Sequence, residues 1–138
     1  MEKKVLIVDD EESIRVVFRK AFERDGWEVR TAGSGEEALE IMRETPSMVL
    51  FLDLNLPGMS GVELSRRIRR QWPMAISFAV TGYSSLFELT DCREAGFEDY
   101  FTKPVDLEML LEAAAGAASR IQRWKGMGKK DRGVFLPL

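Results

Sequence analysis

Hydrophobic and polar positions follow one another along the chain in five similar blocks. Each block begins with a short run of apolar residues, which is typical of a strand buried on both faces of a parallel sheet. Apolar residues three or four positions apart follow each run, and this spacing predicts an amphipathic helix. The five predicted strands are Val5 to Val8, Trp27 to Thr31, Val49 to Leu52, Ala75 to Val80 and Asp99 to Thr102.

Turn and capping residues indicate where the predicted helices begin and end. Ser34 with Glu37, and Ser60 with Glu63, have the spacing of a capping box at a helix N-terminus. Glycine after a helix and proline beyond it are typical of helix ends. Three residues of this kind follow the first, fourth and third predicted helices: Gly26, Gly96 and Pro73.

The last two helices set the expected limits of the domain. We expect the fourth helix over roughly Ser85 to Ala95, and the last one to carry an apolar stripe from Leu107 to Ile121. The helical pattern fails after Arg123, and the following residues are rich in Gly, Lys and Arg. We therefore predict one domain over residues 1–123 and a basic linker or tail over residues 124–138.

Strict alternation of strands and helices with short connections predicts an α/β fold, a doubly wound parallel sheet with helices on both faces. The natural choice is the flavodoxin-like, five-stranded strand order 2-1-3-4-5. In that order the carboxyl ends of strands one and three face each other across the crevice where ligands bind. Asp9 and Asp10 follow the first strand and Asp53 follows the third, so we expect these carboxylates to converge.

Composition narrows the chemistry that such a site can support. The 138 residues carry a net charge of -3, which gives no global basic field for binding nucleic acid, although a local basic patch stays possible. The chain has no His and one Cys, so a metal site must use oxygen ligands, which favours Mg²⁺, Ca²⁺ or Mn²⁺ over Zn²⁺. The charged start is followed by an apolar run too short for a signal peptide or a membrane span, and we expect a cytoplasmic protein.

Five residues at the carboxyl ends of the strands have the composition of an aspartyl-phosphate site. Carboxylates 4 Å apart repel by about 4 kcal/mol per pair at an effective dielectric of 20, and a divalent cation would relieve this repulsion. Thr81 and Lys103 follow strands four and five, so a hydroxyl and a cation reach the same edge. Together they suit a reaction in which Asp53 attacks phosphorus and Thr81 and Lys103 contact the phosphoryl oxygens. Each residue alone also has a purely structural explanation: acids favour helix starts, and Asp and Thr are common at strand ends and caps.

Four motifs, in order and with matching spacing, make the chain closely similar to the receiver domain of bacterial two-component response regulators over about Lys3 to Arg123. They are VDDEES (Val8 to Ser13), DLNLPGMSGVEL (Asp53 to Leu64), TGY (Thr81 to Tyr83) and AGFEDYFTKP (Ala95 to Pro104). The resemblance implies that Asp53 accepts a phosphoryl group from a sensor histidine kinase or phosphotransfer protein. It also implies Mg²⁺ held by Asp9, Asp10, Asp53 and the backbone carbonyl of Asn55.

The same resemblance implies a conformational switch. Phosphorylation would draw in Thr81, and the ring of Tyr100 would follow, which would repack the face formed by helix four, strand five and helix five. That face would control an output domain or a partner protein, with a homodimer as one possible result, and nucleic acid would be reached only through an output domain. The Lys103–Pro104 peptide is expected to be cis, and Asn55 and Tyr83 are expected to tune the lifetime of the phosphorylated state. Tyr100 also has a plainer interpretation as a half-buried strand aromatic.

Other functions stay open at this point. A stand-alone phosphorelay shuttle would need the same site and no output domain. A phosphohydrolase with an aspartyl-phosphate intermediate fits less well, because the lone Asp follows the third strand and no segment is inserted to enclose a substrate. We therefore expect no enzyme in the usual sense, but a phosphoacceptor that assists only its own phosphorylation and dephosphorylation.

Overall fold

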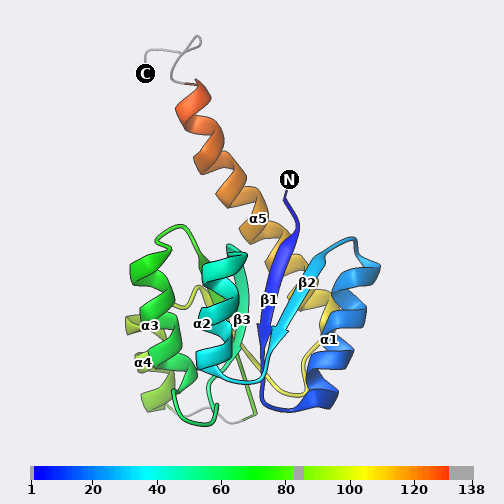
Figure 1. Ribbon diagram of the computed structural model, residues 1–138, viewed down its shortest axis with the longest axis vertical. Helices are drawn as coiled ribbons and strands as arrows, with labels where there is room; N and C mark the ends of the chain where they lie inside the picture. The colour runs from blue at the N-terminus through cyan, green and yellow to red at the C-terminus, as the bar shows by residue number, and fades with distance from the viewer. Residues whose placement is uncertain (1, 83–85, 131–138) are drawn as a thin grey trace.

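A computed structural model describes residues 2–82 and 86–130 of the chain. Five parallel strands form one sheet in the order β2-β1-β3-β4-β5, with helices on both faces (Figure 1), which confirms the predicted architecture. The elements follow one another as β1 Lys4–Val8, α1 Glu12–Arg24, β2 Glu28–Ala32, α2 Gly35–Glu44, β3 Val49–Asp53, α3 Gly61–Gln71, β4 Ile76–Thr81, α4 Leu86–Glu94, β5 Asp99–Thr102 and α5 Leu107–Lys130.

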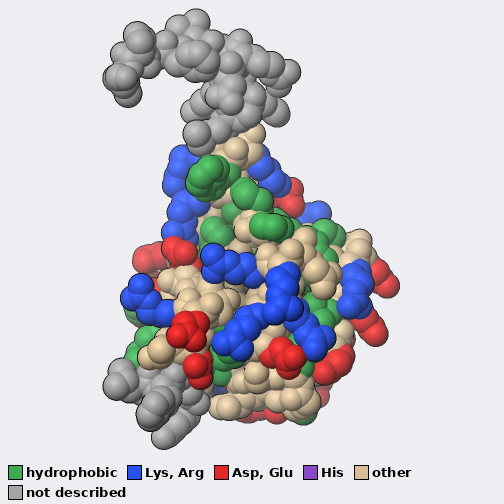
Figure 2. Space-filling model, turned by 90° about the vertical axis from the view of Figure 1, so that its left-hand side faces the viewer, with side chains coloured by type: hydrophobic (Ala, Val, Ile, Leu, Met, Phe, Trp, Pro, Cys, Tyr) green, Lys and Arg blue, Asp and Glu red, His purple; other side chains and the backbone are tan. Residues whose placement is uncertain are grey.

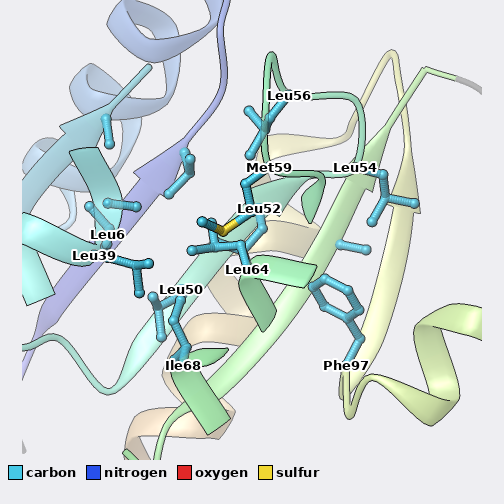
Figure 3. Packing of buried hydrophobic residues seen from close by; sticks show 14 of the residues in the cluster. Leu6, Leu39, Leu50, Leu52, Leu54, Leu56, Met59, Leu64, Ile68 and Phe97 are labelled. Atoms are coloured by element: carbon cyan, nitrogen blue, oxygen red, sulfur yellow. The ribbon is translucent and has the colours of Figure 1, made fainter. Parts of the chain in front are cut away.

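The sheet has a hydrophobic core on each face, because successive residues of a strand point to opposite sides. Leu50 and Leu52 of β3 lie in the core that α2, α3 and the end of α4 cover, as Figure 3 shows from close by. Val49 and Phe51 lie in the other core, under α1 and α5. All five residues of β3 are buried, and β3 is the central strand of the sheet.

The predicted N-terminal caps of α2 and α3 form in the structure. The hydroxyls of Ser34 and Ser60 accept hydrogen bonds from the N–H groups of Glu37 and Glu63, each at 3.2 Å. The Glu37 carboxylate accepts from the N–H of Gly33 at 3.0 Å, one residue before the cap, so this box is shifted by one position. Gly26 and Gly96 have φ values of +87° and +88°, a region that suits glycine at a helix C-terminus.

The last helix is longer than the sequence pattern predicts. α5 runs to Lys130, whereas the expectation was an end near Arg123. Its second half projects beyond the end of the sheet where the strands begin (Figure 1), and Trp124 is 65% exposed there. Residues 122–125 are all exposed, so the apolar stripe stops there while the helix continues. The division at residue 123 stays a prediction, and residues 131–138 of the expected tail lie outside the described ranges.

The other strand boundaries match the expectation, as for β5, or differ from it by one residue. β2 and β4 begin one position later than predicted, and α4 spans Leu86–Glu94. Ser85 and Tyr83, named in the expectations above, lie outside the described residues. Within the ranges that the structure describes, no helix is both long and apolar enough to cross a membrane.

Candidate functional site

Asp53 is the last residue of the most buried strand. It is 5% exposed, and its Oδ1 accepts a hydrogen bond from the N–H of Asn55 at 3.0 Å. Gly61 begins α3 directly against this strand end: a Cβ at that position would collide with the backbone oxygen of Asp53. The sequence therefore places a carboxylate at the carboxyl edge of the sheet and uses the absence of a side chain at Gly61 to pack a helix start beside it.

Asp9 and Asp10 meet Asp53 from the neighbouring strand, as the strand order predicts. One carboxylate oxygen from each of the three residues lies within 4.8 Å of the other two. Asp9 is 2% exposed and its Oδ1 accepts from the N–H of Glu11 at 2.9 Å, whereas Asp10 is exposed. The result is an acidic pocket, defined here as Asp9, Asp10 and Asp53, with two buried walls and one side open to solvent.

Lys103 supplies the counter-charge of the acidic pocket. Its Nζ donates to Oδ2 of Asp9 at 2.9 Å and to Oδ2 of Asp53 at 3.3 Å, and its side chain is only 18% exposed. The peptide bond between Lys103 and Pro104 is cis, in agreement with the expectation from the resemblance. One lysine thus joins the ends of β1 and β3 to the end of β5.

Thr81 and Tyr100 lie on β4 and β5, next to this lysine. Thr81 is fully buried at the end of β4, pairs with Thr102 of β5, and its carbonyl accepts from the N–H of Lys103 at 2.8 Å. Tyr100 lies two residues earlier on β5 than Thr102 and is 37% exposed. The structure therefore brings Thr81 to the edge occupied by Asp53 and Lys103, and leaves the Tyr100 ring partly in solvent.

Burial and neighbouring charges shift the pKa values of Asp53 and Lys103. Burial, helped by the negative charge of Asp9, raises the pKa of Asp53 above its ordinary value, despite the Asn55 N–H and the Lys103 ammonium, which act the other way. Burial alone would lower the pKa of Lys103, but its contacts with Asp9 and Asp53 outweigh that effect and raise it. The ionised Asp53 is thus held at a cost in free energy, which an additional cation would reduce.

Arg15 is a site residue that the sequence pattern did not single out. Its guanidinium donates to the backbone carbonyl of Asp9 at 2.7 Å and lies against Gly33, so it fixes the loop that carries Asp9 and Asp10. Its helical spacing marks it only as a polar position of α1. Gly61 was equally inconspicuous, apart from being a glycine in the first turn of a helix, where it lowers helix propensity.

The chain is similar to known proteins of one family over most of its length. The sequence profile described as the response regulator receiver domain matches residues 5–115. This chain belongs to that family. The receiver family is a signalling domain of two-component systems, and this receiver has the family's fold as well as its sequence pattern.

Individual relatives are similar over most of the receiver. The chain is 33% identical over 114 residues to sporulation initiation phosphotransferase F of Bacillus subtilis, which covers 82% of this chain and 91% of that protein. It is 38% identical over 104 residues to the alkaline phosphatase synthesis transcriptional regulatory protein PhoP of the same organism, covering 75% of this chain and 43% of that protein. The chain therefore spans less than half of that longer relative.

A solved structure shows the same arrangement in space. The CheY-like response regulator receiver domain protein of Methanospirillum hungatei superposes with a TM-score of 0.85 at 30% sequence identity, covering 89% of this chain and 98% of that one. The donor set of the receiver fits the divalent cation associated with such acidic pockets. All three side-chain donors are carboxylate oxygens, which suit Mg²⁺, and the open side at Asp10 leaves room for the waters that Mg²⁺ retains.

Proposed function

We propose that this receiver is a phosphorylation-controlled switch in which Asp53 accepts a phosphoryl group from a sensor histidine kinase or phosphotransfer protein. The observation that carries the proposal is the acidic pocket with Lys103 bound to both Asp9 and Asp53. A buried carboxylate beside a fixed cation, at an edge open through Asp10, suits a nucleophile that must receive a highly charged group. The proposal places the domain in the cytoplasm, where such kinases present their phosphohistidine.

In the proposed reaction an Asp53 carboxylate oxygen forms a bond to phosphorus. The bond from phosphorus to the histidine nitrogen of the donor breaks, and its electron pair stays on that nitrogen. Lys103 and the hydroxyl of Thr81 then contact the added oxygens, and their charge and hydrogen bond offset the negative charge that arrives. Mg²⁺ held by Asp9, Asp10, Asp53 and the carbonyl of Asn55 would supply further positive charge to the phosphoryl oxygens.

The proposed response lies on the face of α4, β5 and α5. A phosphoryl group adds about -1.5 to -2 charges at Asp53 and would draw the Thr81 hydroxyl toward it. Tyr100, now 37% exposed, would turn toward the space beside Thr81 and change the surface of β5. Moving this equilibrium from 1:99 to 99:1 takes about 5.5 kcal/mol, which several charge-assisted hydrogen bonds can supply.

Two outputs fit the similar proteins. The match over 91% of a phosphotransferase favours a shuttle that passes the phosphoryl group on. The match over 43% of a transcriptional regulatory protein favours control of an attached output domain or of a partner, including a second copy of the chain. We propose the second as the main output, because β5 exposes Tyr100 on a surface that a partner can reach, and residues 124–138 as the connection to it.

The experiment is intact-protein mass spectrometry after incubation with Mg²⁺ and acetyl phosphate or phosphoramidate. We expect a single phosphoryl adduct that requires Mg²⁺ and is absent from Asp53→Asn. The matched control is Asp99→Asn, which alters an exposed carboxylate on β5 and is expected to take up the group as the wild type does. No adduct on a folded wild type, or equal uptake by Asp53→Asn, would exclude Asp53 as the acceptor.

A further inference from the structure

Four arginines line one open hollow near the edge of the sheet opposite the acidic pocket. The hollow measures about 570 Å³ and lies between the second half of α3 and the end of α4. Figure 2 looks at this side and shows Lys and Arg side chains gathered across it. The arginine hollow is lined by Arg66, Arg69, Arg70 and Arg93, together with Glu94 and Ala95.

None of the four guanidinium groups has an acidic partner among the residues whose side chains the structure describes, 2–82 and 89–126. Arg67, on the same helix but outside the hollow, pairs with Glu63 at 3.0 Å. Cations in the last turn of a helix offset its dipole, which accounts for a cation at the end of α3 and of α4. Arg66 lies before the last turn of α3, so the helix ends account for only three of the four arginines. The hollow therefore has an unbalanced positive charge.

A second hollow adjoins the first and has a different lining. It measures about 690 Å³ between α3, α4 and β5, and it shares Arg69 and Arg93 with the arginine hollow. Leu89, Phe97 and Tyr100 give it apolar and aromatic walls. Asp99 also lines it, and this carboxylate is held in place by the N–H of Tyr100, which donates to its Oδ1 at 2.8 Å.

We propose that the two hollows together form a binding site for a nucleoside polyphosphate. Guanidinium groups bind phosphate oxygens in a planar, bidentate manner, so the arginine hollow suits the phosphates. The neighbouring hollow suits a flat base beside Tyr100 and Leu89, with Asp99 positioned to accept N–H groups of the base. The neighbouring hollow, at about 690 Å³, has the volume of a small-molecule site.

The lining favours this ligand over a protein partner or a nucleic acid. A protein interface is centred on apolar or aromatic anchors, and the arginine hollow contains only arginines, Glu94 and Ala95. A duplex needs basic side chains spread along a backbone, whereas here the four arginines line one small, open hollow. The arginine hollow lies apart from Asp9, Asp10 and Asp53, but the neighbouring hollow includes Tyr100, the proposed switch residue, so nucleotide binding is measured on the unphosphorylated protein.

The test is isothermal titration calorimetry of the full chain with GTP, ATP, guanosine and inorganic tripolyphosphate. EDTA in the buffer prevents a metal–nucleotide complex from entering the acidic pocket. We expect one nucleotide per chain, with GTP or ATP bound more tightly than guanosine or tripolyphosphate alone. Arg69→Gln and Arg93→Gln should each weaken nucleotide binding about tenfold or more, since each removes a charge-assisted contact with phosphate.

Arg67→Gln is the matched control, because it removes the same charge from the same helix outside the hollow. Its nucleotide affinity should stay within about twofold of the wild type. Tyr100→Ala should weaken binding of the nucleotide but leave that of tripolyphosphate unchanged. Arg66→Gln gives a second test of the hollow should Arg69→Gln, whose side chain packs over Gly96, lose stability.

Four outcomes would overturn the proposal. No nucleotide binding at about 1 mM would exclude the site. Equal affinity for tripolyphosphate and nucleotides would exclude the base-binding hollow. An equal loss in Arg67→Gln would reduce the effect to general charge attraction. Tighter binding of a random-sequence duplex DNA through the same arginines would assign the surface to nucleic acid instead.

Discussion

β3 and β5 belong to one sheet but face opposite conditions. β3 lies between β1 and β4 with every residue buried, whereas β5 is an edge strand with three of its four residues exposed. The proposed phosphoacceptor, Asp53, lies on β3, and the proposed switch residue, Tyr100, lies on β5. On this proposal the reacting group lies on a strand that is buried throughout, and the response lies on a strand whose side chains are largely in solvent.

Replacing one aromatic on each strand should give the largest contrast. Phe51 of β3 is 1% exposed and stacks on Phe78 with ring centroids 4.9 Å apart. Phe51→Ala should lower the free energy of unfolding by about 3–5 kcal/mol, because it leaves a cavity in the core. Tyr100→Ala on β5 should change it by only about 1 kcal/mol or less.

Urea denaturation of both variants measures this contrast. The wild type and each variant should show one cooperative transition, so that the midpoints report stability. Comparable losses for the two substitutions would mean that β5 contributes as much to the core as β3, and the division between a rigid and a responsive strand would be wrong.

Two glycines beside these strands sharpen the comparison. Gly61 follows β3, and a Cβ there would meet the backbone of Asp53 and Leu54, which cannot move aside. Gly61→Ala should therefore cost about 3 kcal/mol and displace Asp53. Gly96 precedes β5 and has a positive φ, but a Cβ there meets the flexible end of Arg69, so Gly96→Ala should cost about 1 kcal/mol.

Denaturant midpoints together with phosphoryl uptake from acetyl phosphate distinguish these two positions. Gly61→Ala should lose uptake even at temperatures where it is folded, whereas Gly96→Ala should retain it. Normal uptake by a folded Gly61→Ala would show that the contact between α3 and the end of β3 does not position Asp53.

Removing the charge of Asp53 on β3 should give the smallest change in stability. Unlike the substitutions above, it should stabilise the protein. Because burial raises the pKa of Asp53 above 3.8, the folded state binds its proton more tightly than the unfolded state does. The resulting destabilisation is absent below the unfolded pKa, grows as the pH rises through the folded pKa, and is fully present above it. Asp53→Asn should therefore raise the melting temperature at pH 7 without metal.

Melting temperatures at pH 7 and at about pH 3, with and without Mg²⁺, measure this effect. The gain of Asp53→Asn should vanish at the acidic pH and narrow when Mg²⁺ stabilises the wild type. Asp99→Asn on exposed β5 should shift stability by no more than about 0.5 kcal/mol. A lower melting temperature for Asp53→Asn at pH 7 would contradict a net cost of the buried charge.

The sequence alone predicted the parts of this molecule that follow from local pattern. The five strands, their order and the convergence of Asp9, Asp10 and Asp53 come from apolar runs and from the geometry of parallel sheets. The length of α5 did not, because beyond residue 123 the sequence has no apolar period, and Trp124 and Lys125 are exposed. The structural role of Gly61 depends on a contact between elements, which no local pattern records.

Individual contacts in the site were also beyond local reasoning. The placement of Lys103 at the carboxyl edge of the sheet was predicted, but its simultaneous hydrogen bonds to Asp9 and Asp53 depend on side-chain geometry. Arg15 bonds a backbone carbonyl, and any polar residue would have suited its helical position. The arginine hollow requires knowing that the ends of α3 and α4 lie side by side.

The hydrogen bonds of Lys103 also make the site depend on complete folding of the sheet. The lysine lies 94 residues after Asp9 and 50 after Asp53, so the first and last strands of the sheet must both be in place before the acids receive their counter-charge. A chain still emerging from the ribosome lacks this counter-charge at Asp9 and Asp53 until Lys103 has joined the sheet. Under the proposed function, only molecules whose synthesis has passed β5 would accept the phosphoryl group.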